Sequence, residues 1–505
     1  MTRRSPQEAL ERLLTRQREL AHIGQARSLM AWDLQTMIPP EGVPARARAV
    51  ATLAAYGHRM LTDPDTDADV AVLEEAARNG SLSGPPARMA VVLRREIDRL
   101  RKIPEDRYRR FAELTANGEA VWRRARAEDR FADFAPLLEE IVGLLREFVE
   151  RWGYQGHPYN ALLDVYEPGL TVDRLDFLFA RLEEGLTSLL ARIERSGKEI
   201  PDAFRGGPFP RAAQEAFLRE VLEAIGFSFT RGRLDTSAHP FTMGIHPTDV
   251  RLTTRYAEDD LAYALYSAVH EGGHGIYEQN LPEELEPYGL MSAASLGVHE
   301  SQSRFLENVL ARSAPFWEYF APRLVAHFPS LAGRTPEEFF RAANRVARSF
   351  IRTEADEVTY NLHVLLRYRL EKDLIAGKLA VRELPEAWRA EMRKLLGIEP
   401  PTDREGVLQD VHWSHGMVGY FPSYTLGNVY AAELLEALLR DVPGLWERVR
   451  VGDFAPILSW LRERVHTQGN LYDPPELLER ATGKSPGPEA LLRYLEAKMA
   501  EVHGL

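Results

Sequence analysis

The sequence predicts an all-α fold, and three observations support this prediction. Apolar residues recur at spacings of three and four along most of the chain, which is the period of one face of an α-helix. The interruptions coincide with proline and glycine clusters, which end helices. Only one short region favours β-structure, so the sheet is expected to be very small. We therefore expect one large helical domain spanning residues 1–505.

The predicted helices follow one another along the chain, and each carries an apolar stripe at helical spacing. The main Pro/Gly clusters between them lie at 80–86, 201–210, 399–406 and 482–488. The helices are predicted at residues 6–33, 70–79, 87–102, 107–127, 135–152, 172–197, 210–226, 259–279, 296–312, 336–373, 384–395, 430–441 and 474–502.

A very small β-hairpin is predicted just before residue 259. Residues 239–241 and 250–256 have the composition of short strands. Such a hairpin is expected to form one wall of a cleft and to bind an extended peptide by strand addition.

The predicted helix 259–279 is the most informative element, because it contains His270-Glu271-Gly272-Gly273-His274. Asp259 and Asp260 precede its apolar stripe, where an N-cap and a first-turn acid belong. Histidines four residues apart share one face of a helix and can both bind one zinc ion. The glutamate between them is placed to take a proton from a water on that ion, as in zinc hydrolases.

Two adjacent glycines in this helix need a physical reason, because each costs about 1 kcal/mol relative to alanine. Gly272 and Gly273 therefore predict that another backbone, or a substrate, approaches the helix closely.

A catalytic zinc ion has three protein ligands and one open position. Glu278 lies one turn beyond His274 and is poorly placed for the third position. Glu300 is the better candidate, because it opens the next helix and an antiparallel neighbour can bring its carboxylate to the first. His299 is the rival, and a purely structural acid at a helix N-terminus is the alternative reading of Glu300.

The composition excludes several functions. The net charge of −12 argues against nucleic acid as a partner. The chain has no cysteine, so disulfides, thiolate metal ligands and a thiol nucleophile are excluded, and a metal must be held by nitrogen and oxygen. The lack of cysteine also fits a reducing compartment. Arginine far outnumbers lysine, which together with the lack of cysteine is a weak indication of a heat-adapted source.

The first twenty residues are typical of an amphipathic helix and lack the apolar core of a signal peptide. We see no uncharged apolar run near the ~18 residues that cross a bilayer. The sequence therefore predicts a cytoplasmic protein without a membrane partner.

Six ordered motifs surround the zinc pentapeptide, and together they resemble the carboxypeptidase Taq family of metallocarboxypeptidases over most of the chain. They are W-D-x-x-T-x-x-P-P at 32–40, H-P-F at 239–241, D-x-R-x-T at 249–253, H-E-S-Q at 299–302, I-R-x-x-A-D at 351–356 and G-x-x-Q-D-x-H-W at 406–413.

The resemblance implies a neurolysin-like helical fold with a deep active-site groove. The position of the N-terminal helices (about 1–130) in the chain would allow them to form a wall of that groove or a lid over it. It implies a homodimer that binds one zinc ion per chain, with cobalt able to substitute. It also implies that single residues are removed, with broad specificity, from peptides with a free C-terminus. Among the candidates for the third ligand, the resemblance selects Glu300.

In the predicted mechanism, Glu271 acts as the general base and later protonates the leaving amine. A further donor should stabilise the oxyanion, and the candidates are Tyr420, Tyr424 and His412. The alternative for both tyrosines is that they only pack and form hydrogen bonds, within an aromatic loop with Gly and Pro hinges.

A guanidinium can bind a terminal carboxylate through two hydrogen bonds. Arg352 and Arg251 are the candidates that the resemblance implies, because they stand in its motifs. Arg352 could instead form an ion pair with Asp356 along one helix, or Asp356 could orient a ligand histidine. Three further polar residues, Gln409, Asp410 and His239, are expected to line the groove or face the metal.

Two other kinds of function remain open from the sequence. The first is another zinc peptidase, either an endo-oligopeptidase with a groove open at both ends or an aminopeptidase, although no acidic signature for an α-amine is apparent. The second is a helical binding protein in which the zinc motif is vestigial.

Overall fold

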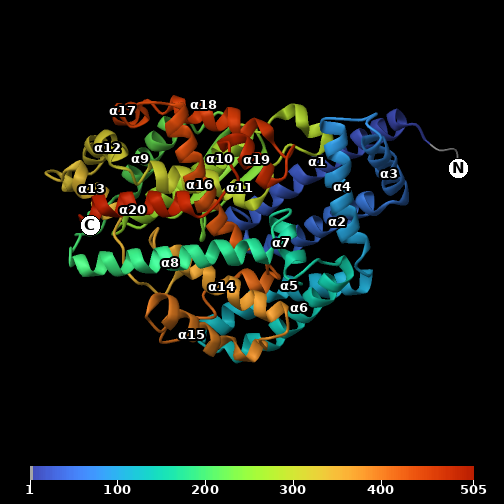
Figure 1. Cartoon of the computed structure of the whole chain (residues 1–505), viewed down its shortest axis with the longest axis horizontal. Coiled ribbons are helices and arrows are strands. Elements are labelled where there is room, and N and C mark those ends of the chain that lie inside the picture. Colours follow the sequence, from blue (N-terminus) through green and yellow to red (C-terminus); the bar gives the residue numbers. More distant parts are fainter. Residues whose placement is uncertain (1–3) are drawn as a thin grey trace.

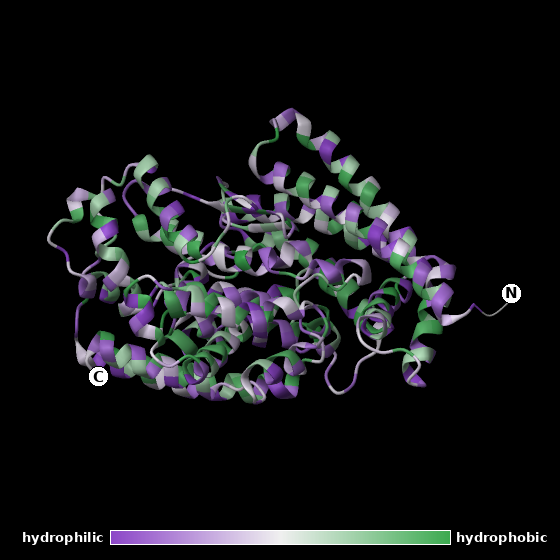
Figure 2. Cartoon of the chain, turned by 90° about the horizontal axis from the view of Figure 1, so that it is seen from above, coloured by the Kyte–Doolittle hydropathy of each residue, from purple (hydrophilic) through white to green (hydrophobic). Residues whose placement is uncertain are grey.

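A computed structural model describes residues 4–505 and shows a helical molecule with one small sheet (Figure 1). The prediction of an all-α fold is confirmed. Along the surface helices, hydrophobic and hydrophilic residues alternate in short bands (Figure 2), as expected for helices that bury one face. Within residues 4–505 no helix is both long enough and apolar enough to cross a membrane.

Helices make up most of the chain, and the three strands lie together near its middle. In chain order the elements are α1 (Pro6–Thr36), α2 (Val43–Thr62), α3 (Pro64–Arg78), α4 (Pro85–Arg101), α5 (Glu105–Ala127), α6 (Phe131–Trp152), α7 (Asn160–Tyr166), α8 (Val172–Ser196), α9 (Arg211–Ala224), β1 (Gly232–Thr236), β2 (Thr242–His246), β3 (Asp249–Thr254), α10 (Leu261–Gln279), α11 (Leu296–Arg304), α12 (Ala314–His327), α13 (Pro336–Ala343), α14 (Tyr360–Ile375), α15 (Leu384–Leu396), α16 (Pro422–Asp441), α17 (Leu445–Arg450), α18 (Ala455–Arg464), α19 (Pro474–Thr482) and α20 (Glu489–His503).

The N-terminal helices form a small core of their own. Ala9 and Leu13 of α1 pack with buried residues of α3 and α4, apart from the main core. Figure 1 shows these blue helices together at one end of the molecule. The main core begins with Ile103 and includes buried residues of α5.

The sheet has three strands in the order β1-β3-β2, with β1 parallel and β2 antiparallel to β3. The predicted hairpin is therefore present as β2 and β3, although β2 begins at Thr242, after the predicted strand 239–241. The sequence did not predict β1, because the segment Gly-Arg-Leu-Asp-Thr has little β-propensity and is held by its parallel neighbour.

Helix α10 follows the prediction closely, because it begins after the N-cap Asp260 and ends at Gln279. It packs against the sheet on one side and against α11 on the other. A Cβ on Gly273 would lie 2.5 Å from the backbone oxygen of Gln302 in α11. On the far side of α11, a Cβ on Gly427 of α16 would clash with Cγ of Glu300. The predicted close approach at Gly273 is thus confirmed.

Several predicted helix boundaries were wrong, and three cases show the reasons. Residues 336–373 form two helices, α13 and α14, separated by an irregular segment, 344–359. Helix α16 starts at Pro422 and not at residue 430, because proline is well suited to the first turn of a helix. Residues 474–502 form α19 and α20, which are separated near the predicted break at 482–488. The sequence also missed five helices, namely α2, α7, α12, α17 and α18.

Candidate active site

Helices α10 and α11 bring three predicted metal ligands together. Nε2 of His270 lies 3.6 Å and Nε2 of His274 lies 3.3 Å from Oε2 of Glu300. The potential ligand atoms of all three side chains lie within 4.8 Å of one another. The two imidazoles come from successive turns of α10, and the carboxylate comes from α11, as predicted from their spacing.

This arrangement fits a divalent metal ion. Bonds of about 2.1 Å to nitrogen and oxygen in a tetrahedral site place neighbouring ligand atoms about 3.4 Å apart. The two N–O separations, 3.3 and 3.6 Å, match that spacing. Two neutral imidazoles and one carboxylate also leave a coordination position for water or substrate, as in catalytic zinc sites.

In His270 and His274, the ring nitrogen Nδ1 faces away from Glu300 and has a hydrogen-bond partner. Nδ1 of His270 donates to Oε2 of Glu307 at 2.9 Å. Nδ1 of His274 lies 2.5 Å from Nδ1 of His299, whose Nε2 donates to Glu278 at 2.8 Å. Because His299 must then accept from His274, both ligand histidines keep the Nε2 lone pair free for a metal.

His299 therefore lies outside the ligand cluster, in contact with His274. The carboxylate of Glu300 faces both Nε2 atoms, so the geometry favours Glu300 over His299 as the third ligand candidate.

Buried charges surround Glu300. Arg304 donates to Glu300 at 2.7 Å and to Glu307 at 3.3 Å. Burial opposes ionisation of Glu300, but Arg304 and the histidines outweigh it and hold its pKa well below the usual value. Burial lowers the pKa of His274 to about 3. The cluster thus presents an ionised carboxylate and a neutral imidazole, the protonation states that bind metals.

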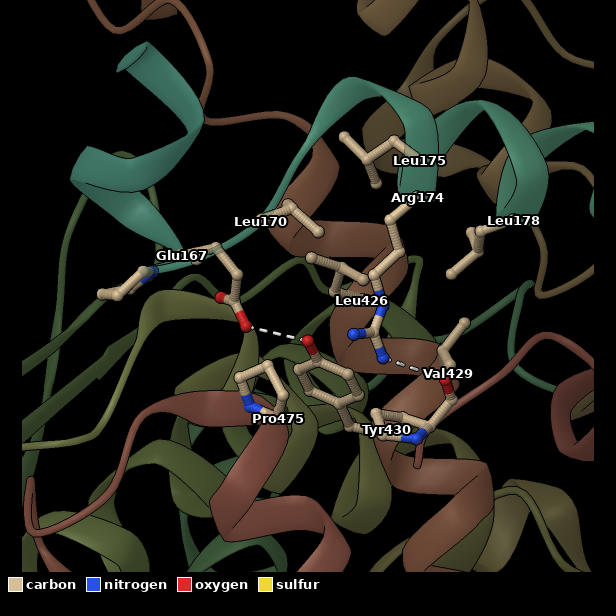
Figure 3. A pocket seen from close by; sticks show the side chains of 12 residues that line it. Glu167, Leu170, Arg174, Leu175, Leu178, Leu426, Val429, Tyr430 and Pro475 are labelled. Atoms are coloured by element: carbon tan, nitrogen blue, oxygen red, sulfur yellow. Dashed lines mark hydrogen bonds between the residues drawn. The ribbon is translucent and has the colours of Figure 1, made fainter. Parts of the chain in front are cut away.

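A second buried carboxylate fixes the beginning of α11. Glu167, at the C-terminus of α7, accepts hydrogen bonds from the backbone N–H of Gly297 at 3.1 Å and from the Tyr430 hydroxyl at 2.8 Å. Figure 3 shows Glu167 and Tyr430 at one side of a small pocket lined otherwise by Leu, Val and Pro side chains and by Arg174. These two hydrogen bonds hold the start of the helix that carries Glu300.

Glu271 lies between the two ligand histidines and is 7% exposed. Its Oε2 accepts a hydrogen bond of 2.7 Å from the hydroxyl of Thr242, at the start of β2. Burial raises the pKa of Glu271, which makes its carboxylate a stronger base. The small sheet thus orients the predicted general base.

The aromatic candidates Tyr420, Tyr424 and His412 form one cluster. The Tyr424 hydroxyl lies 2.9 Å from Nε2 of His412, and the rings of Tyr420 and Tyr424 are 5.2 Å apart. Burial, and then the charge of Glu300, raises the pKa of Tyr420 to about 12. Burial lowers the pKa of His412 to about 3. Tyr424 lies in the first turn of α16 and not in the loop that the sequence predicted.

Arg352 belongs to a buried charge network. Its Nε and one terminal nitrogen donate to Asp410 at 3.0 and 2.8 Å, and Arg367 donates to the other Asp410 oxygen at 2.7 Å. Gln409 accepts from the Arg352 backbone N–H and from the Arg367 side chain. Gln409 and Asp410 thus support Arg352 and Arg367.

The alternative ion pair between Arg352 and Asp356 is absent from the described residues, and the hydrogen bonds of Asp356 do not include a ligand histidine. The carboxylate of Asp356 instead accepts backbone N–H groups of Ala347, Val358 and Thr359. The reason is that residues 344–359 contain only a 3₁₀ turn, Arg352–Glu354, and no α-helix, so Arg352 and Asp356 do not share a helical face.

Arg251 and His239 lie on the sheet side of the site. Arg251 forms two hydrogen bonds of 2.9 Å with Asp249, and its guanidinium lies 4.5 Å from the ring centre of Trp32. His239 is exposed, and its backbone oxygen accepts a hydrogen bond from Ser237. Neither side chain is among the ligand group of the metal cluster.

Sequence reasoning missed Glu307, Thr242, Arg304 and Arg367. Glu307 had a usable signal, because it follows Glu300 by seven residues, which is about two helical turns on the same face. Thr242 and Arg367 had none, since their roles depend on contacts across the fold.

Fold and site together define a helical metal-dependent hydrolase. Two histidines and a glutamate fit a metal ion, and a buried glutamate lies beside them in the pattern of zinc peptidases.

Comparison with known proteins identifies the family. The model of the carboxypeptidase Taq (M32) metallopeptidases matches residues 12–499. Thermostable carboxypeptidase 1 of Thermus thermophilus is 42% identical, with 99% of this chain and all of the relative covered. Carboxypeptidase 1 of Bacillus subtilis is 38% identical, with 96% and 97% covered. The crystal structure of an M32 carboxypeptidase from Deinococcus radiodurans R1 has a TM-score of 0.94 at 37% identity, with 99% and 100% covered.

The chain belongs to the carboxypeptidase Taq (M32) family of metallopeptidases. It is therefore a metal-dependent carboxypeptidase, and the endo-oligopeptidase, aminopeptidase and non-catalytic interpretations find no support.

Proposed function

We propose that this chain removes single residues, with broad specificity, from peptides that have a free C-terminus, and that it uses one zinc ion, which cobalt can replace. The observation that carries the proposal is the joining of His270, His274 and Glu300 into one cluster directly beside the buried Glu271. Zinc is supported by the donor set of the cluster, two imidazole nitrogens and one carboxylate, which is typical of catalytic zinc sites.

A bound zinc ion supplies Lewis-acid chemistry, since it acidifies a water and polarises the scissile carbonyl. Glu271 accepts the proton of the attacking water and later gives it to the leaving amine. Thr242 keeps the Glu271 carboxylate oriented through its 2.7 Å hydrogen bond. Burial favours this role, because it raises the pKa of Glu271 and so makes its carboxylate a stronger base.

Tyr420 is the proposed donor to the oxyanion. Its hydroxyl stays protonated at neutral pH, because burial and the charge of Glu300 raise its pKa to about 12. Tyr424 and His412 support it by packing against its ring, at centroid distances of 5.2 and 5.4 Å. A neutral phenol near the cluster can donate to the charge that develops on the substrate oxygen.

Arg352 is the residue proposed to bind the C-terminal carboxylate of the substrate. Three of its five N–H groups bond Asp410 and Tyr360, which leaves two for substrate. Its guanidinium lies 4.7 Å from the ring centre of Tyr424, so it adjoins the aromatic cluster. Arg251 is the second candidate, although Asp249 and Trp32 already engage it. Three further residues are proposed to line the groove because they stand in the family's motifs, namely His239, Gln409 and Asp410. Of these, Gln409 and Asp410 act by supporting Arg352.

Peptides with blocked ends test the direction of cleavage. An N-acylated peptide should lose its last residue as fast as the free peptide, because the N-terminus is not read. The same peptide with a C-terminal amide should be cleaved at least about tenfold more slowly, because the charged carboxylate that Arg352 would bind is missing. Time-resolved mass spectrometry distinguishes stepwise loss from the C-terminus from internal cleavage, and internal cleavage would contradict the proposal.

The location, oligomeric state and heat adaptation of the protein are also proposed. A cytoplasmic, heat-adapted homodimer, without nucleic acid or membrane partners, fits the cysteine-free, arginine-rich and acidic composition. Two relatives bear the name thermostable carboxypeptidase 1, which supports heat adaptation. The deep groove and the movement of the N-terminal helices as a lid belong to the same proposal.

A further inference from the structure

The metal ligand His270 depends on a short segment of unusual helix. Directly after α11, residues Phe305–Leu310 form a π-helix, a rare conformation that occurs often at functional sites. Glu307 in this segment accepts the hydrogen bond from Nδ1 of His270 at 2.9 Å. The wider turn of the π-helix thus determines where the Glu307 carboxylate lies, and through it the orientation of the His270 ring.

A backbone oxygen of the π-helix is bound by side chains from the far end of the chain. The oxygen of Asn308 accepts hydrogen bonds from Nζ of Lys498 at 3.0 Å and from the Tyr494 hydroxyl at 3.1 Å. Both donors belong to α20, the last helix. A lysine at the carbonyl end of a helix satisfies oxygens that have no partner within the helix.

Lys498 is itself held by a buried acid. Its Nζ lies 2.5 Å from Oε1 of Glu357, and each of the two side chains is 7% exposed. The Tyr494 hydroxyl also contacts Glu357, at 2.9 Å. Burying a lysine and a glutamate is costly, and apolar residues of similar volume would often be as stable. The pair therefore calls for a reason other than stability, and its contact with the π-helix provides one.

We propose that Lys498 is a positioning residue of the metal site. Together with Glu357 and Tyr494 it holds the backbone of Asn308, so that Glu307 stays within hydrogen-bonding distance of His270. Without this support the π-helix can relax to an ordinary helical turn, which would rotate Glu307 away. The metal would then be bound by a histidine without its partner, which typically weakens metal affinity 10- to 100-fold.

The test is the metal affinity of the full-length protein after removal of its metal. In the Lys498→Met variant, competition with a chromogenic chelator should show zinc binding at least about tenfold weaker than in the unaltered protein. The rise in melting temperature that zinc produces should shrink as well, since tenfold weaker binding removes about 1.4 kcal/mol of stabilisation at saturating metal. Neither the chelator competition nor the melting measurement depends on enzyme activity.

A matched control separates positioning from general stability. Lys484 also pairs with a buried acid, Glu433, at 2.7 Å, but its other partner is Glu436 and its bonds lie outside the π-helix. Lys484→Met should lower the melting temperatures of the metal-free and zinc-bound forms equally and leave zinc affinity unchanged. Tyr494→Phe is the milder variant, since it removes one hydroxyl from the same Asn308 oxygen, and it should weaken zinc binding several-fold.

The inference is overturned if Lys498→Met and Tyr494→Phe both bind zinc as tightly as the unaltered protein. If Lys498→Met does not fold, the zinc affinity of Tyr494→Phe alone decides. The inference requires only that His270 binds the metal. Failure of the end-blocked peptide assay would therefore contradict the proposed function and leave this proposal standing.

Discussion

At the scale of single residues, Glu271 is the side chain on which the chemistry depends most. Glu271→Gln keeps the shape and the Thr242 contact but removes the base. We expect turnover to fall by about 10²–10⁴-fold, the usual contribution of a positioned base, with unchanged metal content. Steady-state kinetics and metal analysis of the same preparation measure both.

Thr242→Val provides the matched control for this variant, because it removes only the orienting hydroxyl. Its turnover should fall less than that of Glu271→Gln, and its metal content should not change. If Glu271→Gln retained most of its activity, the proton would have to go to another group, and the proposed mechanism would be wrong.

The site residues that sequence could predict are those related by short-range geometry. His270 and His274 are four apart on one helix, so their shared face follows from the helical period. Arg352 shows the opposite case. Helical spacing offered an ion pair with Asp356 as an alternative role for Arg352, but the partner of Arg352 is Asp410, 58 residues further on. A partner so distant in sequence is chosen by the fold, and no local pattern encodes it.

At the scale of elements, the irregular segment 344–359 explains why one predicted helix was wrong. The segment contains neither proline nor glycine, so its sequence carries no break signal. Tertiary contacts interrupt the helix instead. Arg352 donates hydrogen bonds to Asp410, and Asp356 caps the turn that leads into α14. Burial of two arginines around one aspartate outweighs the intrinsic helix propensity of this stretch.

The packing of α10 on α11 gives a prediction for Gly273. In Gly273→Ala the new Cβ would lie 2.5 Å from the backbone oxygen of Gln302, and backbone cannot move aside cheaply. The two helices must separate, which draws Glu300 away from the histidines. We expect at least about tenfold weaker zinc affinity, in the range found when metal ligands lose their support.

Gly143→Ala is the control for this substitution. Gly143 lies in α6 with nothing within 4 Å of a new Cβ, so alanine there should stabilise the protein by about 0.5–1 kcal/mol and leave zinc affinity unchanged. Equal zinc affinity in both glycine variants would show that the α10–α11 spacing does not control the metal site.

At the scale of the whole molecule, two buried acids outside the metal cluster make the stability of the fold depend on pH. Burial raises the pKa values of Glu167 and Glu371 to about 7. Glu371 accepts hydrogen bonds from Tyr159 and Trp413, and Glu167 holds the start of α11. Both join helices that are distant in sequence, so their ionisation affects the stability of the fold as a unit.

The sign of the pH effect follows from proton binding. Between the usual glutamate pKa of about 4.5 and about 7, the folded protein keeps a proton on Glu167 that the unfolded chain has released. The contribution of Glu167 to the free energy of unfolding is therefore greatest below about pH 4.5, and it decreases as the pH rises to 7. The shift of the Glu167 pKa from 4.5 to about 7 corresponds to a loss of about 3 kcal/mol in the free energy of unfolding.

Glu167→Gln removes this titration while its amide can still accept the Gly297 N–H. Relative to the unaltered protein, the variant should therefore gain stability as pH is raised from 5 to 8. Melting temperatures of both proteins across that range measure the effect, and Glu371, which is present in both, cancels from the difference. A difference in melting temperature that stays constant with pH would mean that Glu167 is already ionised in the fold at pH 5, with its charge held by Tyr430 and the N-terminus of α11.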